Sequence, residues 1–271
     1  MMNSRILKNK EQVIIESVRM ATFNEAVEDL KRAKESGADS ALVHFQMITE
    51  PLTDENIKKI IEATDLPIMA INYRDKNGKE SADVDEERAS VMTRAIELGA
   101  TCVDVWGDMF DNDSRQSLSN CSLPFASANP KEITMDPDCV RRQKEYIDKI
   151  HALGGEVLMS SHVGVELSIE QTVSLALEIE SRGVDIVKII ANANTKEQAM
   201  TVMHTLPVLT RTLKVPFLYQ CSGPYARFVR IYAPMFGSCA ALCHTQYGGI
   251  TNPEKPLIKD VQKGWALIEN K

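Results

Sequence analysis

One lysine stands inside an otherwise apolar run, GVDIVKIIANANT, at residues 183–195. Lys188 is flanked by Val187 and Ile189, and the run has the composition of a strand that is buried on both faces. Burial disfavours the charged form of a lysine and so lowers its pKa. A neutral amine can attack a ketone or an aldehyde to form an imine, and the protonated imine acidifies a neighbouring C–H bond. Lys188 is therefore a candidate for imine chemistry.

A histidine closes the preceding β-rich run, VLMSSH, at residues 157–162. The unperturbed pKa of a histidine lies near neutrality, so such a residue can move the proton that this chemistry releases. The spacing places His162 and Lys188 on adjacent strands and at the same end of them. The simpler alternative is a structural Lys188 that pairs with Asp104, or a lysine that reaches solvent from a strand of different phase.

The elements that must position these side chains repeat along the chain. An amphipathic helix ends, a break follows and a β-rich run begins, with Gly37, Gly99, Gly154 and Gly183 at four of the breaks. Glycine is the usual left-handed residue after a helix. Eight such strand–helix units predict a (β/α)8 TIM barrel with a single domain over residues 1–271. A doubly wound open sheet is the rival fold, because local patterns do not reveal closure.

Helical spacing of apolar residues predicts six of the helices between the strands. They cover residues 23–36, 54–63, 84–98, 137–153, 169–182 and 196–212. Residues suited to capping a helix stand at the starts of five of them, namely Thr53, Asp83, Asp136, Ser168 and Thr195.

One connection is longer than the others. Residues 110–135 follow the fourth predicted strand and show no clear periodicity. Loops of this length inside a compact domain are usually functional or disordered. Because this one leaves the carboxyl end of a strand, where barrel enzymes keep their active sites, we expect an insert that covers or recognises the substrate.

Polar residues stand near the carboxyl ends of several other predicted strands. Candidates for orienting His162, or for a secondary catalytic role, are Asp104, Asp108 and His44. Candidates for binding substrate are Arg74, Arg230, Gln46, Asn72, Trp106, Gln220 and Ser238. The two arginines suit an anionic group, because a guanidinium binds a carboxylate through two parallel hydrogen bonds.

These segments resemble, in the same order, the type I 3-dehydroquinate dehydratase family of Schiff-base enzymes in the shikimate pathway. LPIMAINYR is similar to the family strand that ends in Thr-x-Arg, with Asn72 at the threonine and Arg74 at the arginine. LMSSHV is similar to its Ser-x-His, with His162 matching. VDIVKIIANANT is similar to its Asp-Ile-Val-Lys-Ile-Ala segment, which places Lys188 on the imine lysine.

A further segment, CSGPYARFVRIYAPMFGS, resembles the family's Gly-rich turn, arginine and Phe-Gly-Ser, with Arg230 and Ser238 at the matching positions. The resemblance implies a barrel enzyme whose lysine forms an imine and which needs no cofactor and no metal. It also implies a homodimer.

The departures from the family pattern concern substrate recognition. The family glutamate that orients the catalytic histidine falls on Trp106. The family's Glu-x-Arg becomes His44-x-Gln46, which removes a substrate-binding arginine. Its closing Ser-Ala-Pro-Gly-Gln loop is replaced by HTQYGGITNPEK. We therefore expect a divergent member with a different substrate.

The leading prediction is a carbon–oxygen lyase. Lys188 would form an imine with a hydroxylated cyclic ketone or a related carbonyl compound, and His162 would remove the α-proton so that water or another β leaving group departs. The first alternative is a class I aldolase that uses the same lysine. The second is a catalytically retired barrel that binds a metabolite or a protein partner.

Composition narrows the classes of partner. The formal net charge is −7 and no block of Lys and Arg stands out, which argues against nucleic acid and against an anionic membrane surface. No apolar stretch approaches the roughly 20 residues of a membrane span, and the N-terminus lacks the apolar core of a signal peptide. Six scattered cysteines are typical of reduced thiols. We expect a cytoplasmic homodimer that acts on a small carbonyl compound, anionic in character.

Overall fold

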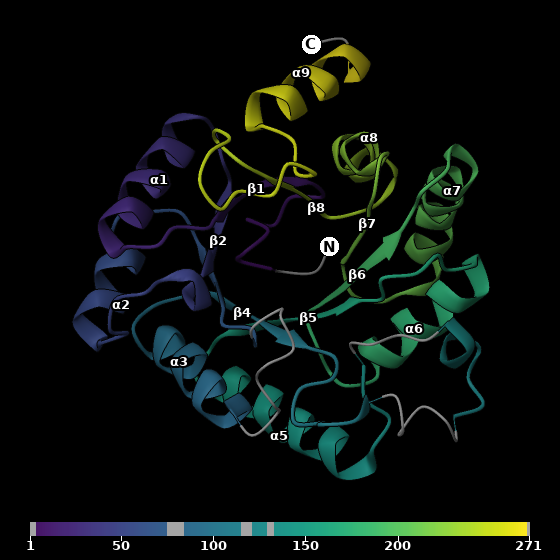
Figure 1. Ribbon diagram of the computed structural model, residues 1–271, viewed down its shortest axis with the longest axis horizontal. Coiled ribbons are helices and arrows are strands. Elements are labelled where there is room, and N and C mark those ends of the chain that lie inside the picture. Colours follow the sequence, from purple (N-terminus) through teal and green to yellow (C-terminus); the bar gives the residue numbers. More distant parts are fainter. Residues whose placement is uncertain (1–3, 75–83, 115–120, 129–132, 270–271) are drawn as a thin grey trace.

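Eight parallel strands form a single sheet in the computed structural model, which describes residues 4–74, 84–114, 121–128 and 133–269 (Figure 1). The order of the strands is β7-β6-β5-β4-β3-β2-β1-β8. Their bounds are β1 (Val13–Val18), β2 (Ser40–His44), β3 (Ile68–Ile71), β4 (Cys102–Trp106), β5 (Glu156–His162), β6 (Ile186–Asn192), β7 (Phe217–Ser222) and β8 (Ala240–Cys243).

The sheet closes nearly completely on itself. β7 and β8 stand at the two ends of the strand order. The backbone N–H of Cys239, just before β8, donates to the carbonyl of Phe217 in β7 at 2.7 Å. The predicted (β/α)8 barrel is confirmed, and the open doubly wound sheet is not the fold of this chain.

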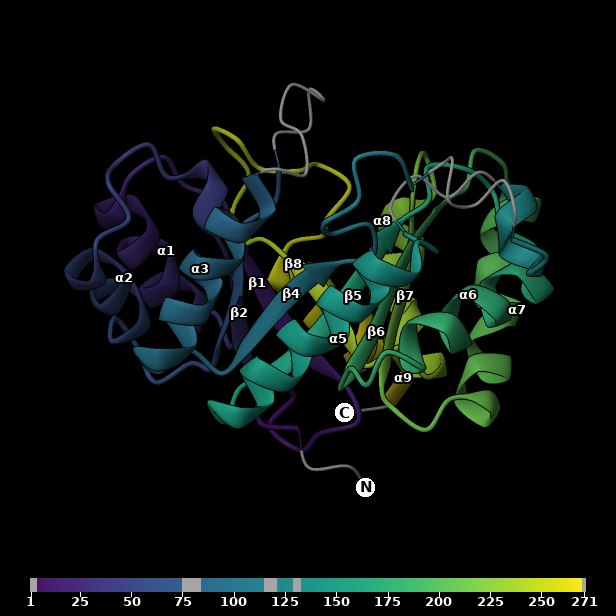
Figure 2. The same ribbon diagram turned by 90° about the horizontal axis from the view of Figure 1, so that it is seen from below.

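The helices lie around the outside of the barrel (Figures 1 and 2). They are α1 (Phe23–Glu35), α2 (Asp54–Ile61), α3 (Asp85–Glu97), α5 (Pro137–Ala152), α6 (Ile169–Glu180), α7 (Lys196–Thr212), α8 (Ala226–Tyr232) and α9 (Ile258–Glu269). Short 3-10 turns are η1 (Phe45–Met47), η3 (Pro124–Ala128) and η4 (Ala233–Phe236). In the part of the chain that the structure describes, no helix is long and apolar enough to cross a membrane.

Local sequence accounts for where these helices begin and end. The six predicted helices agree to within two residues at each end with α1, α2, α3, α5, α6 and α7. The side chains of Thr53, Asp136, Ser168 and Thr195 accept hydrogen bonds from backbone N–H groups of the following first turn. Asp83 lies outside the described residues. The four predicted junction glycines all have positive φ, between 79° and 111°.

The amino end of the barrel is closed by the segment before β1. Ile6 and Leu7 are buried in the same apolar cluster as inward-facing strand residues such as Ile15. The backbone N–H groups of Arg5 and Ile6 donate to the Glu156 carboxylate at 2.6 and 3.3 Å. Figure 2 shows this segment at one end of the strands and the longer loops at the other. The carboxyl end is therefore the end at which a site can open.

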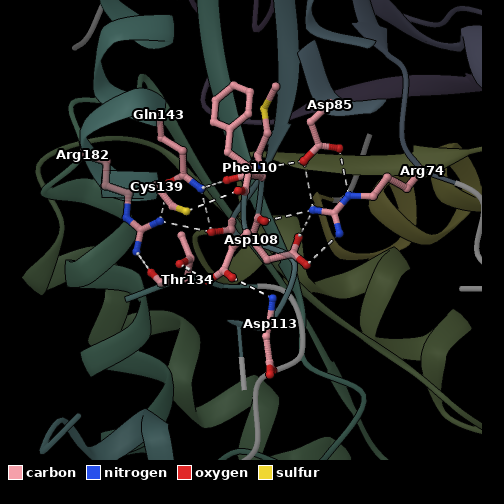
Figure 3. Close-up of polar contacts among 12 residues, drawn as sticks. Arg74, Asp85, Asp108, Phe110, Asp113, Thr134, Cys139, Gln143 and Arg182 are labelled. Carbon is pink, nitrogen blue, oxygen red and sulfur yellow. Dashed lines mark hydrogen bonds and ion pairs between the residues drawn. The ribbon is translucent and has the colours of Figure 1, made fainter. Parts of the chain in front are cut away.

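The segment after β4 is anchored to the barrel wall where the structure describes it. The buried guanidinium of Arg182 donates to the carbonyls of Gly107 and Thr134 at 3.1 and 2.7 Å. The Gln143 amide donates to the carbonyls of Gly107 and Met109, both at 3.0 Å. Figure 3 shows both side chains pointing at this turn. Residues 115–120 and 129–132 of the predicted insert lie outside the described part, so its covering role stays a prediction.

Candidate active site

A cavity of about 490 Å³ lies at the carboxyl ends of the strands. Successive side chains of a strand point to opposite faces, so alternate residues face the barrel interior, and those nearest the carboxyl ends line this cavity. The other residues face the helices and form the outer core. The described residues that line the cavity are Arg19, Leu42, His44, Gln46, Ile71, Tyr73, Arg74, Trp106, Asp108, His162, Gly164, Lys188, Ile190, Ser222, Arg230, Leu242, Asn252, Glu254 and Lys255.

Lys188 lies in the middle of β6, and only 4% of it is exposed. Its Nζ is 2.7 Å from Oδ2 of Asp104 on β4, a fully buried carboxylate. The hydroxyl of Tyr73 donates to the other oxygen of Asp104 at 2.5 Å and also contacts the Ser160 hydroxyl. The ion pair expected for a structural lysine is therefore present. The same carboxylate can hold a protonated imine, because an imine formed on Nζ keeps both the positive charge and an N–H.

His162 lies at the end of β5, on the strand next to Lys188. The register pairs Ser160 with Lys188 and His162 with Ile190, so His162 stands two residues nearer the mouth and on the same inward face. Its ring meets the Tyr73 ring edge-on, with centroids 5.9 Å apart. The two predicted catalytic side chains thus line one cavity from adjacent strands.

The three candidates for orienting His162 have other contacts. Asp104 binds Lys188 and Tyr73. Asp108 lies 3.4 Å from the Arg74 guanidinium. The remaining candidate, His44, contacts the Ser17 hydroxyl at 3.1 Å through Nε2 and the Gln46 amide at 3.2 Å through Nδ1.

Both predicted anion-binding arginines line the cavity, and each has an acidic neighbour. Arg74 donates two hydrogen bonds to Asp85, at 2.9 and 3.1 Å, besides its contact with Asp108. Arg230 is 3% exposed, donates to Gln220 Oε1 at 2.5 Å, and lies 3.9 Å from Glu254. Their charge is partly balanced within the protein itself.

Three residues predicted to bind substrate are not part of the cavity lining. Asn72 points to the outer face, where it contacts the backbone and guanidinium of Arg88 at 3.4 and 3.1 Å. The side chain of Gln220 accepts a hydrogen bond from Arg230 and donates one to the carbonyl of Ala240 at 3.2 Å. Ser238 accepts a hydrogen bond from the backbone of Tyr219 at 3.3 Å. All three therefore lie outside the described cavity lining, in the wall of the barrel.

Trp106 gives this cavity an aromatic surface. Its ring centroid lies 4.0 Å from that of Tyr73, and the Arg74 guanidinium lies 5.5 Å above it. The indole N–H is buried, and none of the described residues accepts a hydrogen bond from it. A flat ligand could stack against this surface.

Tyr73 and Lys255 are cavity residues that were not predicted from the sequence. Strand alternation contained the signal for Tyr73, because Met69 and Ile71 face inward and residue 73 follows in the same phase. Lys255 lies in the loop after β8, for which the sequence offers no periodicity. Its ammonium contacts the hydroxyl of Ser17.

A buried histidine next to the cavity predicts a specific pH dependence of stability. His244 accepts a hydrogen bond from the backbone of Asn252 through Nε2 at 3.1 Å, and its Nδ1 lies 3.6 Å from Glu16. Burial, and then the charges of Lys255 and Arg19, lower the pKa of His244 from its usual 6.5 to about 3. Between these pH values the unfolded chain binds a proton that the folded chain does not.

We therefore expect acid to destabilise the wild type relative to His244→Gln, whose amide can still accept from Asn252. The unfolding free energy of the wild type should fall relative to that of His244→Gln by up to about 1.4 kcal/mol per pH unit as the pH falls below 6.5. Denaturant unfolding at pH 4.5, 5.5, 6.5 and 7.5 measures it. His204→Gln, at an exposed position of α7, is the control and should track the wild type. Parallel pH profiles for wild type and His244→Gln would refute the neutral buried ring.

Sequence comparison identifies a family that matches nearly the whole chain. The profile described as type I 3-dehydroquinase matches residues 14–271. A bifunctional 3-dehydroquinate dehydratase/shikimate dehydrogenase, chloroplastic, from Arabidopsis thaliana is 25% identical over 258 residues. That match covers 94% of this chain and only 37% of the plant protein.

Solved structures show the same fold at low identity. The 3-dehydroquinate dehydratase of Geobacillus kaustophilus HTA426 superposes with a TM-score of 0.72 at 13% identity, covering 95% of this chain and 91% of that one. The type I enzyme of Clostridium difficile, with covalently modified comenic acid, gives 0.71 at 12% identity and covers 95% and 92%.

Proposed function

The chain belongs to the type I 3-dehydroquinase family, and from this premise we propose that it is an imine-forming hydro-lyase whose substrate is not 3-dehydroquinate. The observation that carries the proposal is a lysine buried in the cavity at the carboxyl end of the barrel, on the strand next to a cavity histidine. We assign the imine to Lys188 and the proton transfer to His162.

In this proposal Asp104 interacts with both charged forms of the Lys188 nitrogen, the ammonium and the protonated imine. At 2.7 Å it can accept the ammonium proton, which leaves the neutral amine free to attack the substrate carbonyl with loss of water. Asp104 returns this proton to the carbinolamine hydroxyl, which leaves as water, and the regenerated carboxylate then stabilises the protonated imine. The Tyr73 hydroxyl holds the other oxygen and fixes the orientation of the carboxylate.

His162 then moves the second proton. As a base it takes the α-proton, and the C–H electrons flow into the imine to give an enamine. The enamine expels the β-hydroxyl, which leaves as water with the proton that His162 returns. Hydrolysis of the conjugated imine frees Lys188 and the enone product. The edge-on Tyr73 ring limits the orientations open to the imidazole.

The residues around this centre support a different substrate. Gln46 contacts His44 at the place where the family pattern has a substrate-binding arginine. Arg230 has Glu254 as a neighbour, so a substrate carboxylate must compete with a protein carboxylate there. Trp106 adds apolar area beside Tyr73, which favours a flatter and less hydroxylated ligand.

The substrate is proposed to be anionic because of the charges that face it. The described cavity lining contains five cationic side chains, Arg19, Arg74, Lys188, Arg230 and Lys255. It contains two carboxylates, Asp108 and Glu254. Asp104 and Asp85 balance Lys188 and Arg74, and Glu254 lies near Arg230. Arg19 and Lys255 have no carboxylate within 4.0 Å among the described residues, so an anion is favoured on their side of the cavity.

A direct comparison of rates tests the substrate assignment. Loss of two charge-assisted hydrogen bonds, each contributing about 1.5–3 kcal/mol, predicts a kcat/KM for 3-dehydroquinate lowered by roughly 100-fold or more. The measurement follows the enone absorbance, with the Geobacillus kaustophilus enzyme assayed in parallel. Turnover of 3-dehydroquinate at about 10 per second or more would contradict the proposal and show that 3-dehydroquinate is the substrate. A carbonyl fragment released without an enone would favour the aldolase.

A further inference from the structure

A second buried lysine lines the same cavity from the loop after β8. Lys255 lies in the loop between β8 and α9, is 6% exposed, and lines the cavity. Its Nζ donates to the hydroxyl of Ser17 at the end of β1, and that hydroxyl in turn contacts His44. The ammonium is therefore held in place by a neutral group.

The loop that carries Lys255 is fixed to the mouth of the barrel at several points. Its two ends are joined by a parallel bridge between His244 and Leu257. Three hydrogen bonds tie the interior of the loop to other parts of the chain. The carbonyl of Ile250 accepts from Arg19 at 3.0 Å, and that of Pro253 accepts from Arg227 at 2.8 Å. The Glu254 carboxylate accepts from the backbone N–H of Gly223 at 2.8 Å. The Tyr247 hydroxyl donates to the carbonyl of Lys255 itself at 2.7 Å. Lys255 is thus positioned by the fold.

This ammonium has no ion pair with any carboxylate in the described part of the chain. Lys188, Arg74 and Arg230 each have a carboxylate within 4.0 Å, whereas Lys255 has none there. Burial without a counter-ion disfavours the charged form of Lys255. An anion that enters the cavity would stabilise that charged form and accept a charge-assisted hydrogen bond from it.

We propose that Lys255 is an anion-binding residue that receives a carboxylate or phosphate oxygen of the substrate in the cavity of Lys188. That the bound anionic group belongs to the substrate rests on the function proposed above. Arg19, on the same side and with only the carbonyl of Ile250 as its hydrogen-bond acceptor in the described residues, is placed to assist. In this arrangement the substrate spans the cavity, with its carbonyl at Lys188 and its anionic group at Lys255.

Proton uptake should accompany this binding. Burial, and then the charges of Arg19, Arg230 and Lys188, lower the pKa of Lys255 well below its usual value, while Glu16 opposes the shift. A bound anion would raise it again, so anion affinity should fall as the pH rises. The groups facing Lys255 from the surrounding elements are Glu16, Ser17, Arg19, His44, Lys188, Arg230, His244 and Glu254.

Anion binding to the purified full-length chain tests the proposal without any carbonyl chemistry. Sulfate and malonate, neither of which titrates between pH 7 and 9, are used as probes in calorimetric titrations at constant ionic strength. We expect Lys255→Met to lower the affinity at pH 7 by tenfold or more. Lys255→Arg should retain affinity but lose most of the pH dependence. Lys259→Met, on the exposed face of α9, is the matched control and should bind as the wild type does.

Each outcome decides a specific point. Tighter sulfate binding identifies a phosphate-like group, and tighter malonate binding a carboxylate. Unchanged affinity in a folded Lys255→Met, or the same loss in Lys259→Met, would overturn the proposal. Lys188→Met should still bind both anions, so a failure of imine chemistry at Lys188 and a failure of anion binding at Lys255 can be told apart.

Discussion

Lys188→Met should abolish turnover of every carbonyl compound that the wild-type protein dehydrates, by at least about 10⁴-fold in kcat. Methionine fills a similar volume but has no amine, so neither the imine nor its electron-withdrawing effect can form. The measurement is enone formation at saturating carbonyl compound, together with kcat and KM.

The control for Lys188→Met addresses its effect on folding. The substitution leaves Asp104 fully buried without its cation, which we expect to lower the unfolding free energy by about 3–5 kcal/mol. The double variant Lys188→Met/Asp104→Asn removes that unpaired charge and should recover most of the stability while remaining inactive. Activity that returns with stability in the double variant would show that Lys188 has only a structural role.

His162→Asn should lower kcat by about 10²–10⁴-fold while imine formation at Lys188 persists. Asparagine keeps a polar side chain at the mouth of the cavity but cannot take a proton from carbon at neutral pH. The separation of the two steps is the informative result, because a merely structural histidine would affect both. His204→Asn is the control and should leave kcat unchanged. Equal loss of imine formation and turnover in His162→Asn would contradict the assigned role.

Most of the barrel could be predicted because its signals are local. The glycines that end α1 and α3, at residues 37 and 99, and the capping side chains such as Ser168 act within one turn of the chain. α8 and α9 were not predicted. α8 has seven residues, which is too short for a clear apolar period, and α9 follows a loop that is ordered by contacts with distant residues.

The site could be predicted in part, and strand phase explains which residues were placed correctly. Lys188 and His162 were placed on neighbouring strands from the sequence, and both line one cavity. Asn72 was expected there because it stands near the end of the third predicted strand and matches the family pattern, yet the inward phase of β3 passes through Ile71 to residue 73. That assignment conflicts with alternation that was already visible in the sequence.

Other features of the site depend on contacts that no local pattern encodes. Lys255 is 238 residues from Ser17, and its burial requires the whole loop after β8 to fold over the barrel mouth. The neutralisation of Arg230 by Glu254 arises in the same way, since these residues come from α8 and from that loop. Recognition of the substrate is therefore less predictable from sequence than the position of the reactive lysine.

Reductive trapping shows whether Lys188 forms an imine in this cavity. The protein is incubated with hydroxyacetone or with 3-dehydroquinate, reduced with borohydride, digested and mapped by mass spectrometry. We expect a borohydride-dependent adduct on the peptide that contains Lys188 with at least one of the two probes, and no adduct in Lys188→Met. The absence of an adduct with either probe, or an adduct on Lys255 in its place, would contradict imine formation at Lys188.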